Sequence, residues 1–338
     1  MIIQENVSLK PYNTFGIEVR ARYFKEINNL AELKSALELK DYPEIFVLSG
    51  GSNLLLTADL DRLVLYLNLK GKEIVHEDDS EIVLRIMAGE NWHDLVLWTL
   101  ERNYGGLENL ALIPGNTGTA PIQNIGAYGV EIKDVLVRCH AMHVPSREIH
   151  TFSNEACNFG YRDSFFKREG KGLYIITAVD LRLSKKEHQT NVHYAPLKAE
   201  LAERGISEPG IKDIANAVIA IRSRKLPDPK ELGNSGSFFK NPVIEDSKYK
   251  ELIIKFPDLP SYAMAEGRYK IPAAWLIDHC EFKGKRFGDA GVHENQALVL
   301  VNHGNASGKE ILDLARKIQA EVASIFGIEL MPEVNIIG

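Results

Sequence analysis

The pattern of apolar and polar positions along the chain predicts a mixture of helices and strands. Apolar residues that recur at helical spacing predict amphipathic helices over residues 30–40, 91–104, 211–225 and 308–326. Short runs of apolar and β-branched residues predict strands over residues 44–48, 62–67, 81–88, 135–143, 173–183, 297–301 and 330–337.

The ends of these helices carry recognisable capping residues. Asn91 is expected to cap the second helix, and Gly105 is expected to close it. Ser307 and Glu310 have the spacing of a capping box at the start of the last helix. The Pro-rich strip 226–229 stops the third helix and is the best candidate for a domain boundary.

Residues 113–129, IPGNTGTAPIQNIGAYG, follow neither the helical nor the strand period, and we call them the glycine loop. Glycines allow positive φ and close approach, and Pro114 and Pro121 stiffen the turns between them. We expect many free N–H groups that point one way, as in a cradle for a phosphate or for the polar edge of a cofactor ring. A surface loop would not need its apolar residues, so the loop should be buried; these residues are Ile113, Ile122, Ile125, Ala127 and Tyr128.

A second glycine-rich segment, Ser49–Asn53 (SGGSN, the glycine turn), follows the strand predicted over residues 44–48. A strand followed by a glycine turn with hydroxyl and amide side chains is one way to present N–H donors to a phosphate. A plain β-turn fits this short segment equally well.

Residues 158–164, NFGYRDS, form the arginine turn, in which Arg162 follows a glycine and a tyrosine. An arginine on such a turn suits recognition of a carboxylate or a phosphate. A surface ion pair between Arg162 and Asp163 explains the same residues, and the sequence does not decide between the two.

Residues 233–242, GNSGSFFKNP, form the serine segment, in which small residues lead to Ser237 and two phenylalanines are expected to anchor the chain in a core. The alternative is a bulged turn into a strand, which we disfavour because Lys225, Ser237, Lys240 and Asn241 make a dense polar set. An isolated glutamate in a short apolar strand, such as Glu333, usually faces solvent.

Composition narrows the function classes. A chain of 338 residues suggests two or three domains. Its net charge of -6 gives no reason to expect nucleic acid or an anionic membrane as a partner. No apolar run has transmembrane length, and residues 1–15 lack the features of a signal peptide. Cys139, Cys157 and Cys280 are scattered and odd in number, which fits a reducing cytoplasm.

Several common catalytic motifs are absent from the sequence. No GxGxxG follows a strand, and there is no P-loop, no GxSxG elbow and no HExxH; His293-Glu294 lacks the second histidine. Two glycine-rich segments precede a separate segment with Arg, Ser, Lys and Asn. This order suggests a phosphate-bearing cofactor bound by the first half and a substrate capped by the second, and it gives no metal site.

Together, the glycine turn, the glycine loop, the arginine turn, KLPDP at 225–229 and the serine segment closely resemble the UDP-N-acetylenolpyruvoylglucosamine reductase family. AGVHENQALVLVN and LMPEV in the tail fit as well, so the resemblance covers essentially the whole chain. Two departures, Ser49 in place of the usual glycine and Asn234-Ser235, remove no group that the chemistry uses.

The resemblance implies an α+β fold of the vanillyl-alcohol-oxidase (PCMH) type, with two α/β subdomains for FAD and a C-terminal α/β substrate-binding domain. We expect the first subdomain over residues 1–70, completed by 328–338, the second over 71–226, and the substrate domain over 227–327.

The resemblance also implies an NADPH-dependent, FAD-mediated reduction of UDP-N-acetylglucosamine enolpyruvate to UDP-N-acetylmuramate, which serves peptidoglycan synthesis and thereby cell shape and division. The implied enzyme is a cytoplasmic flavoprotein and a monomer. Its partner would be a small UDP-sugar, without nucleic acid, membrane or metal.

Site residues follow from the same resemblance. Arg162 would stabilise the charge that develops next to the substrate carboxylate, Ser237 would protonate C2, and Glu333 would lie in the same network. The expected cofactor-binding residues are Ser49, Gly50, Gly51, Ser52, Asn53, Gly115, Gly118, Thr119, Gln123, Asn124, Gly126 and Ala127. The expected substrate-binding residues are Tyr161, Lys225, Asn241, Gln296 and Tyr194, the last matching the substrate-closing tyrosine of the longer subtype.

Two rival functions are weighed against this interpretation. An FAD-dependent alcohol or sugar oxidase of the same fold would often attach the flavin through His or Cys near the cradle, and neither glycine segment has one. A non-catalytic nucleotide-sugar-binding protein would not need Arg162, Ser237 and a flavin cradle together. A purified protein without a flavin spectrum would count against both enzymes.

Overall fold

The computed structural model describes residues 1–338, which divide into two compact units. The first unit comprises residues 1–7, 21–50 and 61–223, and the second comprises residues 8–20, 51–60 and 224–338. The last crossing between them therefore lies just before the Pro-rich strip. The expected division of the chain into three domains stays a prediction. None of the helices combines the length and the apolar character that spanning a membrane requires.

The first unit begins with a four-stranded sheet of order β1-β2-β5-β3, in which β3 and β5 are parallel. Its strands are β1 (Gln4–Ser8), β2 (Arg20–Ile27), β3 (Ile45–Leu48) and β5 (Leu60–Leu67). Helix α1 (Leu30–Ala36) is shorter than predicted and buries Leu33 and Ala36 in the core of this sheet.

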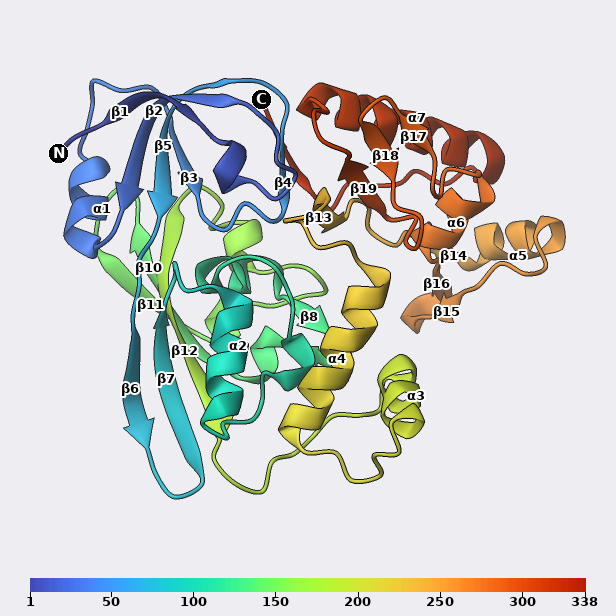
Figure 1. Ribbon diagram of the computed structural model, residues 1–338, viewed down its shortest axis with the longest axis horizontal. Helices are drawn as coiled ribbons and strands as arrows, with labels where there is room; N and C mark the ends of the chain where they lie inside the picture. Colours follow the sequence, from blue (N-terminus) through green and yellow to red (C-terminus); the bar gives the residue numbers. More distant parts are fainter. The chain divides into compact units, whose positions relative to one another are not determined.

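A five-stranded antiparallel sheet of order β11-β10-β12-β7-β6 forms the rest of the first unit (Figure 1). Its strands are β6 (Lys72–Glu77), β7 (Glu81–Met87), β10 (Leu136–His143), β11 (Ile149–Ser153) and β12 (Tyr174–Ser184). Strands β6 and β7 pair as an antiparallel hairpin. Apolar residues of β7, β10 and β12 pack with those of the helices in one core.

The helices of the first unit are α2 (Trp92–Glu101), α3 (Ala195–Glu203) and α4 (Ile211–Lys225). The side chain of Asn91 accepts the Asp94 N–H, so the predicted cap of α2 is confirmed. Gly105 does not close this helix: Asn103 takes the left-handed conformation, which asparagine tolerates, and Gly105 bridges to Ser184. Helix α4 has its predicted bounds, and the residues of its apolar stripe are buried: Ile211, Ile214, Ala215, Val218 and Ile221.

The second unit contains sheets of order β13-β19-β18-β17 and β14-β16-β15, and a parallel pair of β4 and β20. Its strands are β4 (Leu54–Leu56), β13 (Gly233–Ser237), β14 (Val243–Glu245), β15 (Tyr262–Ala263), β16 (Arg268–Lys270), β17 (Arg286–Phe287), β18 (Ala290–Val292), β19 (Val299–Asn302) and β20 (Asn335–Ile337). The last strand is shorter than predicted, because Glu333 donates its N–H to Phe238 and Pro332 bridges to Phe239.

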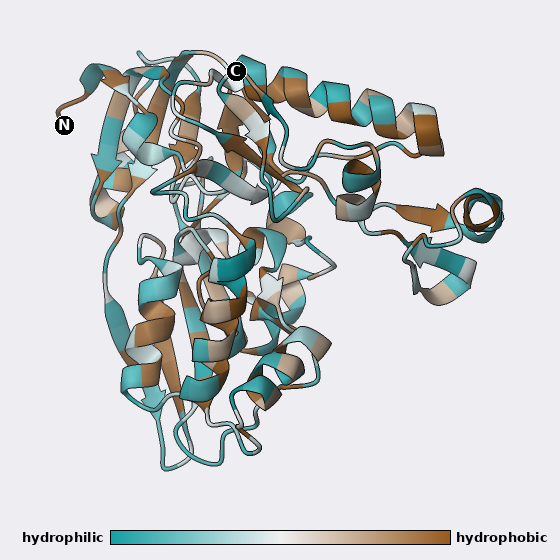
Figure 2. Ribbon diagram, turned by 45° about the vertical axis from the view of Figure 1, so that its right-hand side comes forward, coloured by the Kyte–Doolittle hydropathy of each residue, from teal (hydrophilic) through white to brown (hydrophobic).

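Three helices pack in the second unit: α5 (Asp246–Lys255), α6 (Ala273–His279) and α7 (Gly308–Phe326). The predicted capping box of Ser307 and Glu310 opens α7, and Gly327 ends it with a φ of 63°. Figure 2 shows apolar and polar residues alternating along α7, as expected for a helix with one buried face.

Candidate active site

In the first unit, the glycine turn and the glycine loop approach each other backbone to backbone. A Cβ on Gly50 would lie 2.7 Å from the Gly115 Cα and 2.8 Å from the Asn116 nitrogen, so only glycine allows this approach. The Asn116 amide also donates to the Ser49 hydroxyl over 3.3 Å. Gly118 lies against Ala88, whose Cβ would be 2.5 Å from an added Cβ. The predicted cofactor segments of this unit therefore form one assembly.

The glycine loop uses more of its own N–H groups than predicted. Short 3-10 turns cover Thr117–Thr119 and Pro121–Gln123. The expectation of many free donors is wrong for the following N–H groups, all bonded to carbonyls of the chain: Thr117, Gly118, Thr119, Ala120, Asn124 and Ile125. The backbone N–H groups of Gly50, Gly115 and Asn116 donate to no group of the chain. These three donors flank the closest approach of the two segments and suit a phosphate or a cofactor ring edge.

The burial predicted for the glycine loop is confirmed. Ile125 is buried, and the remaining apolar residues pack on the core of the first unit: Ile113, Ile122, Ala127 and Tyr128. Asn124 is fully buried, and both N–H groups of its amide are used by the Glu131 carboxylate (2.9 Å) and the Gly160 carbonyl (3.1 Å). The Asn124 side chain therefore has no donor left for a ligand.

The arginine turn is tied directly to the glycine loop. Gly160 and Asp163 bond each other, which leaves Tyr161 and Arg162 at the tip, and Arg162 adopts a left-handed φ of 54°. The Arg162 guanidinium donates to the Gly126 carbonyl over 3.0 Å, at β8 (Gly126–Ala127), which pairs with β9 (Val130–Glu131). Asp163 pairs with Arg168, so the alternative of an Arg162–Asp163 surface pair is not what forms.

The structure adds two residues that the sequence interpretation missed, Tyr128 and Arg222. The Tyr128 hydroxyl lies close to the partly buried Arg222 guanidinium, which donates to the Leu112 carbonyl over 3.3 Å. Burial lowers the pKa of Arg222, and the nearby Arg162 charge lowers it further. Burial raises the pKa of Tyr128, although the Arg222 charge opposes this shift.

Two guanidinium groups that repel each other beside a partly buried phenol suit the binding of an anion. The signal for Arg222 was present in the sequence. It lies four residues after Val218, inside the apolar stripe of α4. Burying a charged side chain there costs free energy unless it has partners, so its presence indicates a role.

In the second unit, the structure brings Ser237 and Glu333 to neighbouring chain segments. Ser237 ends β13 and pairs with Val299 of β19 after a bulge, so the serine segment does begin as the bulged strand that we disfavoured. The Glu333 N–H donates to the carbonyl of Phe238, the residue after Ser237. Phe238 and Phe239 are both buried, which confirms their expected role as anchors.

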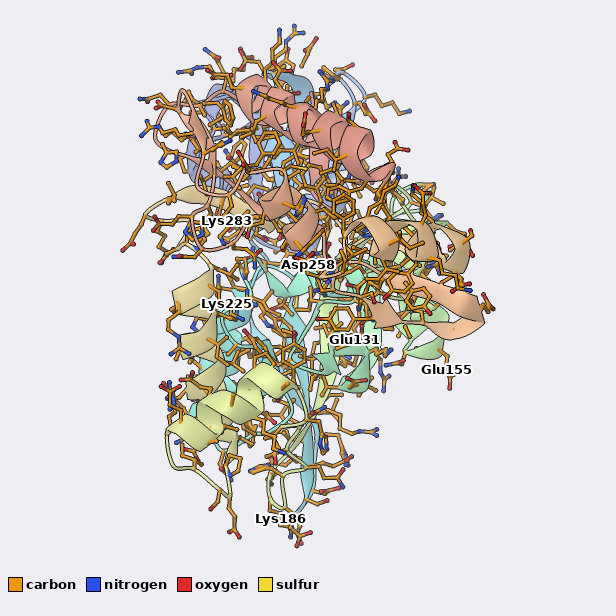
Figure 3. All side chains as sticks on the ribbon, turned by 90° about the vertical axis from the view of Figure 1, so that its right-hand side faces the viewer. Glu131, Glu155, Lys186, Lys225, Asp258 and Lys283 are labelled. Atoms are coloured by element: carbon orange, nitrogen blue, oxygen red, sulfur yellow. The ribbon has the colours of Figure 1, made fainter.

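The other predicted residues of the second unit lie on separate segments. Gly51 and Asn53 continue the glycine turn, and the Asn53 carbonyl accepts from Asn335, two residues after Glu333. Asn241 and Gln296 make local contacts, accepting the N–H groups of Ala273 (2.9 Å) and Leu298 (3.3 Å). Lys225 is exposed at the end of α4 (Figure 3).

The residues present fit a flavin nucleotide. The glycine turn and glycine loop meet where added Cβ atoms would collide, and they offer the uncommitted N–H groups of Gly50, Gly115 and Asn116. Hydroxyl groups of Ser49 and Thr119 lie beside them, the latter donating to the Asn116 carbonyl. Such a site supplies hydrogen bonds to a diphosphate and to a ring edge without adding charge.

Comparison with known proteins agrees with this geometry. A family model for the C-terminal domain of UDP-N-acetylenolpyruvoylglucosamine reductase matches residues 228–337, and one for an FAD binding domain matches residues 23–153. The UDP-N-acetylenolpyruvoylglucosamine reductase of Flavobacterium johnsoniae is 56% identical over 337 residues and covers 100% of both chains. That of Pseudomonas putida is 48% identical and covers 98% of each chain.

The solved structure of the Thermus caldophilus UDP-N-acetylenolpyruvylglucosamine reductase (MurB) matches 100% of both chains with a TM-score of 0.71 and 26% identity. The predicted α+β fold, an FAD-binding fold of the vanillyl-alcohol-oxidase type followed by a reductase C-terminal domain, is confirmed. With relatives of this identity along its whole length, the chain belongs to the UDP-N-acetylenolpyruvoylglucosamine reductase family of FAD-dependent oxidoreductases.

Proposed function

We propose that this protein uses NADPH and FAD to reduce UDP-N-acetylglucosamine enolpyruvate to UDP-N-acetylmuramate, as a cytoplasmic step in peptidoglycan precursor synthesis. The observation that carries this proposal is the bond from Arg162 to Gly126 (3.0 Å). It joins the residue suited to a substrate carboxylate to the loop suited to a flavin. When bound, FAD would take hydride from NADPH and deliver it to the terminal carbon of the enolpyruvyl group.

The role of Arg162 follows from where charge develops in this reaction. Hydride addition leaves negative charge on C2, which spreads into the adjacent carboxylate, and a fixed guanidinium stabilises such charge. The bond to Gly126 and the turn between Gly160 and Asp163 hold the side chain in place before substrate arrives. The Arg222 guanidinium, which interacts with the Arg162 charge, adds a second positive charge nearby.

Ser237 would give its hydroxyl proton to C2. Its hydroxyl makes no hydrogen bond within the chain, whereas the Ser235 hydroxyl, two residues earlier, donates to the Leu54 carbonyl. A serine is a poor acid in water, but a carbon enolate is a strong base, so an aligned hydroxyl suffices. Glu333, on the adjacent segment, would orient this proton donor. Tyr161, Tyr194, Lys225, Asn241 and Gln296 would bind the UDP-sugar.

Anaerobic stopped-flow absorbance of the purified protein tests the proposal. NADPH should bleach the flavin spectrum, and UDP-N-acetylglucosamine enolpyruvate should restore it without oxygen. Bleaching that only oxygen reverses would favour an FAD-dependent alcohol or sugar oxidase of the same fold. A colourless protein that binds no added FAD would contradict both enzymes.

A further inference from the structure

The segment between β12 and α3, residues 185–194, carries Tyr194 and lies against the end of the glycine loop. We call it the tyrosine strap. Its start is held by His188, whose Nδ1 lies 2.7 Å from the Ser184 hydroxyl. Its middle is held by Asn109 and Asn191. Tyr194 itself is about half exposed.

Asn109 joins the strap to the glycine loop with one side chain. Its amide donates one N–H to the Tyr128 carbonyl over 3.0 Å and the other to the Asn191 carbonyl over 2.8 Å. Only 1% of Asn109 is exposed, so water does not compete for these bonds. Both donors of the amide are spent on this connection, which no other residue type of this size could make.

Asn191 adds a second connection between the same two segments. Its amide donates to the Gly129 carbonyl over 3.0 Å, and its side-chain oxygen accepts the His193 N–H over 3.3 Å. An added Cβ on Gly129 would lie 3.3 Å from the Asn191 amide nitrogen, and Gly129 has a φ of 84°. The last residue of the glycine loop is therefore shaped to receive the strap.

The two connections place one tyrosine against another. The rings of Tyr128 and Tyr194 meet edge to face, with centroids 5.4 Å apart. Tyr128 has a left-handed φ of 50°, a conformation that a tyrosine keeps only when its surroundings hold it. The Tyr128 hydroxyl interacts with the Arg222 charge, so neighbouring side chains connect Arg222 to Tyr194 through Tyr128.

We propose that Asn109 is a positioning residue that couples the glycine loop to the tyrosine strap, so that an ordered cofactor loop holds Tyr194 ready for the substrate. This inference rests on the proposed function, because it assigns Tyr194 to the UDP-sugar. Both amide N–H groups of Asn109 are bonded to carbonyls of the chain, so it would act by keeping the Tyr128 and Asn191 carbonyls at a fixed separation. Loss of its amide removes the bonds to the Tyr128 and Asn191 carbonyls and should loosen the strap.

Hydrogen–deuterium exchange of the FAD-loaded enzyme tests the connection itself. Asn109→Ala should speed exchange of peptides covering residues 187–196. The matched control is Asn154→Ala, because the Asn154 amide also donates to two carbonyls, Lys133 and Leu136 (both 2.7 Å), yet touches neither segment. If Asn109→Ala fails to fold, Asn191→Ala removes the second connection and serves the same test. Unchanged exchange in the strap would overturn the proposal.

Steady-state and stopped-flow kinetics test the consequence for the reaction. Asn109→Ala should raise the KM for the enolpyruvyl substrate about tenfold, while NADPH still bleaches the flavin at the wild-type rate. Asn154→Ala should change neither value. A freed strap with an unchanged KM would overturn the coupling. A wild-type enzyme that does not reduce the substrate at all would instead contradict the proposed function, and the exchange result would still stand on its own.

Discussion

The glycine loop and strand β13 are both rich in small polar residues, yet they use their glycines differently. In the first unit, Gly50 and Gly118 allow two loops and a strand end to touch, and the glycine loop folds into 3-10 turns. In the second unit, Gly233 lets β13 lie against the Phe15 carbonyl, and the segment stays a strand with a bulge.

The difference concerns which polar groups remain available. Six N–H groups of the glycine loop donate to carbonyls of the chain, two of them to Ala88 and Glu90 outside the loop, whereas Gly115 and Asn116 keep their donors where the loop meets the glycine turn. Strand β13 commits the Asn234 and Ser235 side chains to structure and leaves the Ser237 hydroxyl unbonded. One region is therefore suited to hold a cofactor by its backbone, and the other to present a single reactive side chain.

Replacing Ser237 should have the largest effect on the rate of substrate reduction. Ser237→Ala removes the proposed proton donor, so substrate reduction should fall by about 10²–10⁴-fold, while NADPH still bleaches the flavin. Stopped-flow traces separate the two half-reactions. Ser235→Ala is the control from the same strand: it loses a buried hydrogen bond and should cost about 1 kcal/mol of stability with little change in turnover. Equal losses in both variants would remove Ser237 from its role.

Replacing Arg162 tests the other region. Arg162→Ala should lower turnover by about 10²–10³-fold, because a preorganised charge that stabilises the transition state is lost. Arg162→Lys should recover part of this loss, since it keeps the charge but not the bond geometry to Gly126. The control is Arg182→Ala on β12. It removes only an exposed ion pair with Glu81 of β7 and should behave like wild type. Turnover of Arg162→Ala close to that of wild type would leave the arginine turn with a structural role only.

Periodicity predicted the larger elements of this fold well. The bounds of α4, the cap of α2 and the capping box of α7 were all readable, because local spacing and local hydrogen bonds determine them. Predicted bounds were wrong where contacts with residues distant in the sequence determine the end of an element. The strand expected over residues 330–337 is short because the Glu333 N–H donates to the Phe238 carbonyl and the Met331 carbonyl accepts the Lys240 N–H, from residues about ninety positions away.

The sequence allowed individual site residues to be predicted from their motifs, but it did not allow the contacts between them to be predicted. The sequence pointed to Arg162 and Ser237, but no spacing could show that Arg162 bonds Gly126 or that Asn124 is fully spent on its neighbours. Arg222 was overlooked because it lies inside a correctly predicted apolar stripe. A charged residue within an apolar stripe must be compensated by partners, so it is a stronger sign of a functional site than the apolar residues around it.

A side chain placed between the glycine turn and the glycine loop should lower FAD affinity, an effect of intermediate size. In Gly50→Ala the new Cβ would meet the Gly115 backbone at 2.7 Å, so the segments must separate and FAD affinity should fall about tenfold or more. Flavin content after gel filtration and titration with FAD measure this. Gly210→Ala is the control, because its nearest neighbour is the Asp213 carboxylate at 3.5 Å. Full flavin retention by Gly50→Ala would show that the close approach does not shape the cradle.

The smallest effect on turnover is expected at Asp180, on the sheet of the first unit. Its buried carboxylate pairs with Arg85 (2.8 Å), Arg138 (3.3 Å) and His140 (3.1 Å). Burial alone would raise the pKa of Asp180, but the bonds to His140 and Arg85 outweigh it and lower the pKa to about 2. No residue of this cluster is among those proposed for cofactor or substrate, so Asp180→Asn should keep its kinetic constants at pH 7.

The stability of the same variant should depend on pH in a defined direction. Because the pKa of Asp180 is depressed in the folded protein, its contribution is complete above the ordinary value of 3.8 and disappears as pH falls through about 2. The difference in unfolding free energy between wild type and Asp180→Asn should therefore shrink by about 2 kcal/mol between pH 5 and pH 2. Urea unfolding followed by tryptophan fluorescence measures it. A variant that keeps this stability difference at all pH values, or loses turnover as Ser237→Ala does, would show that stability and chemistry are not separated between these regions.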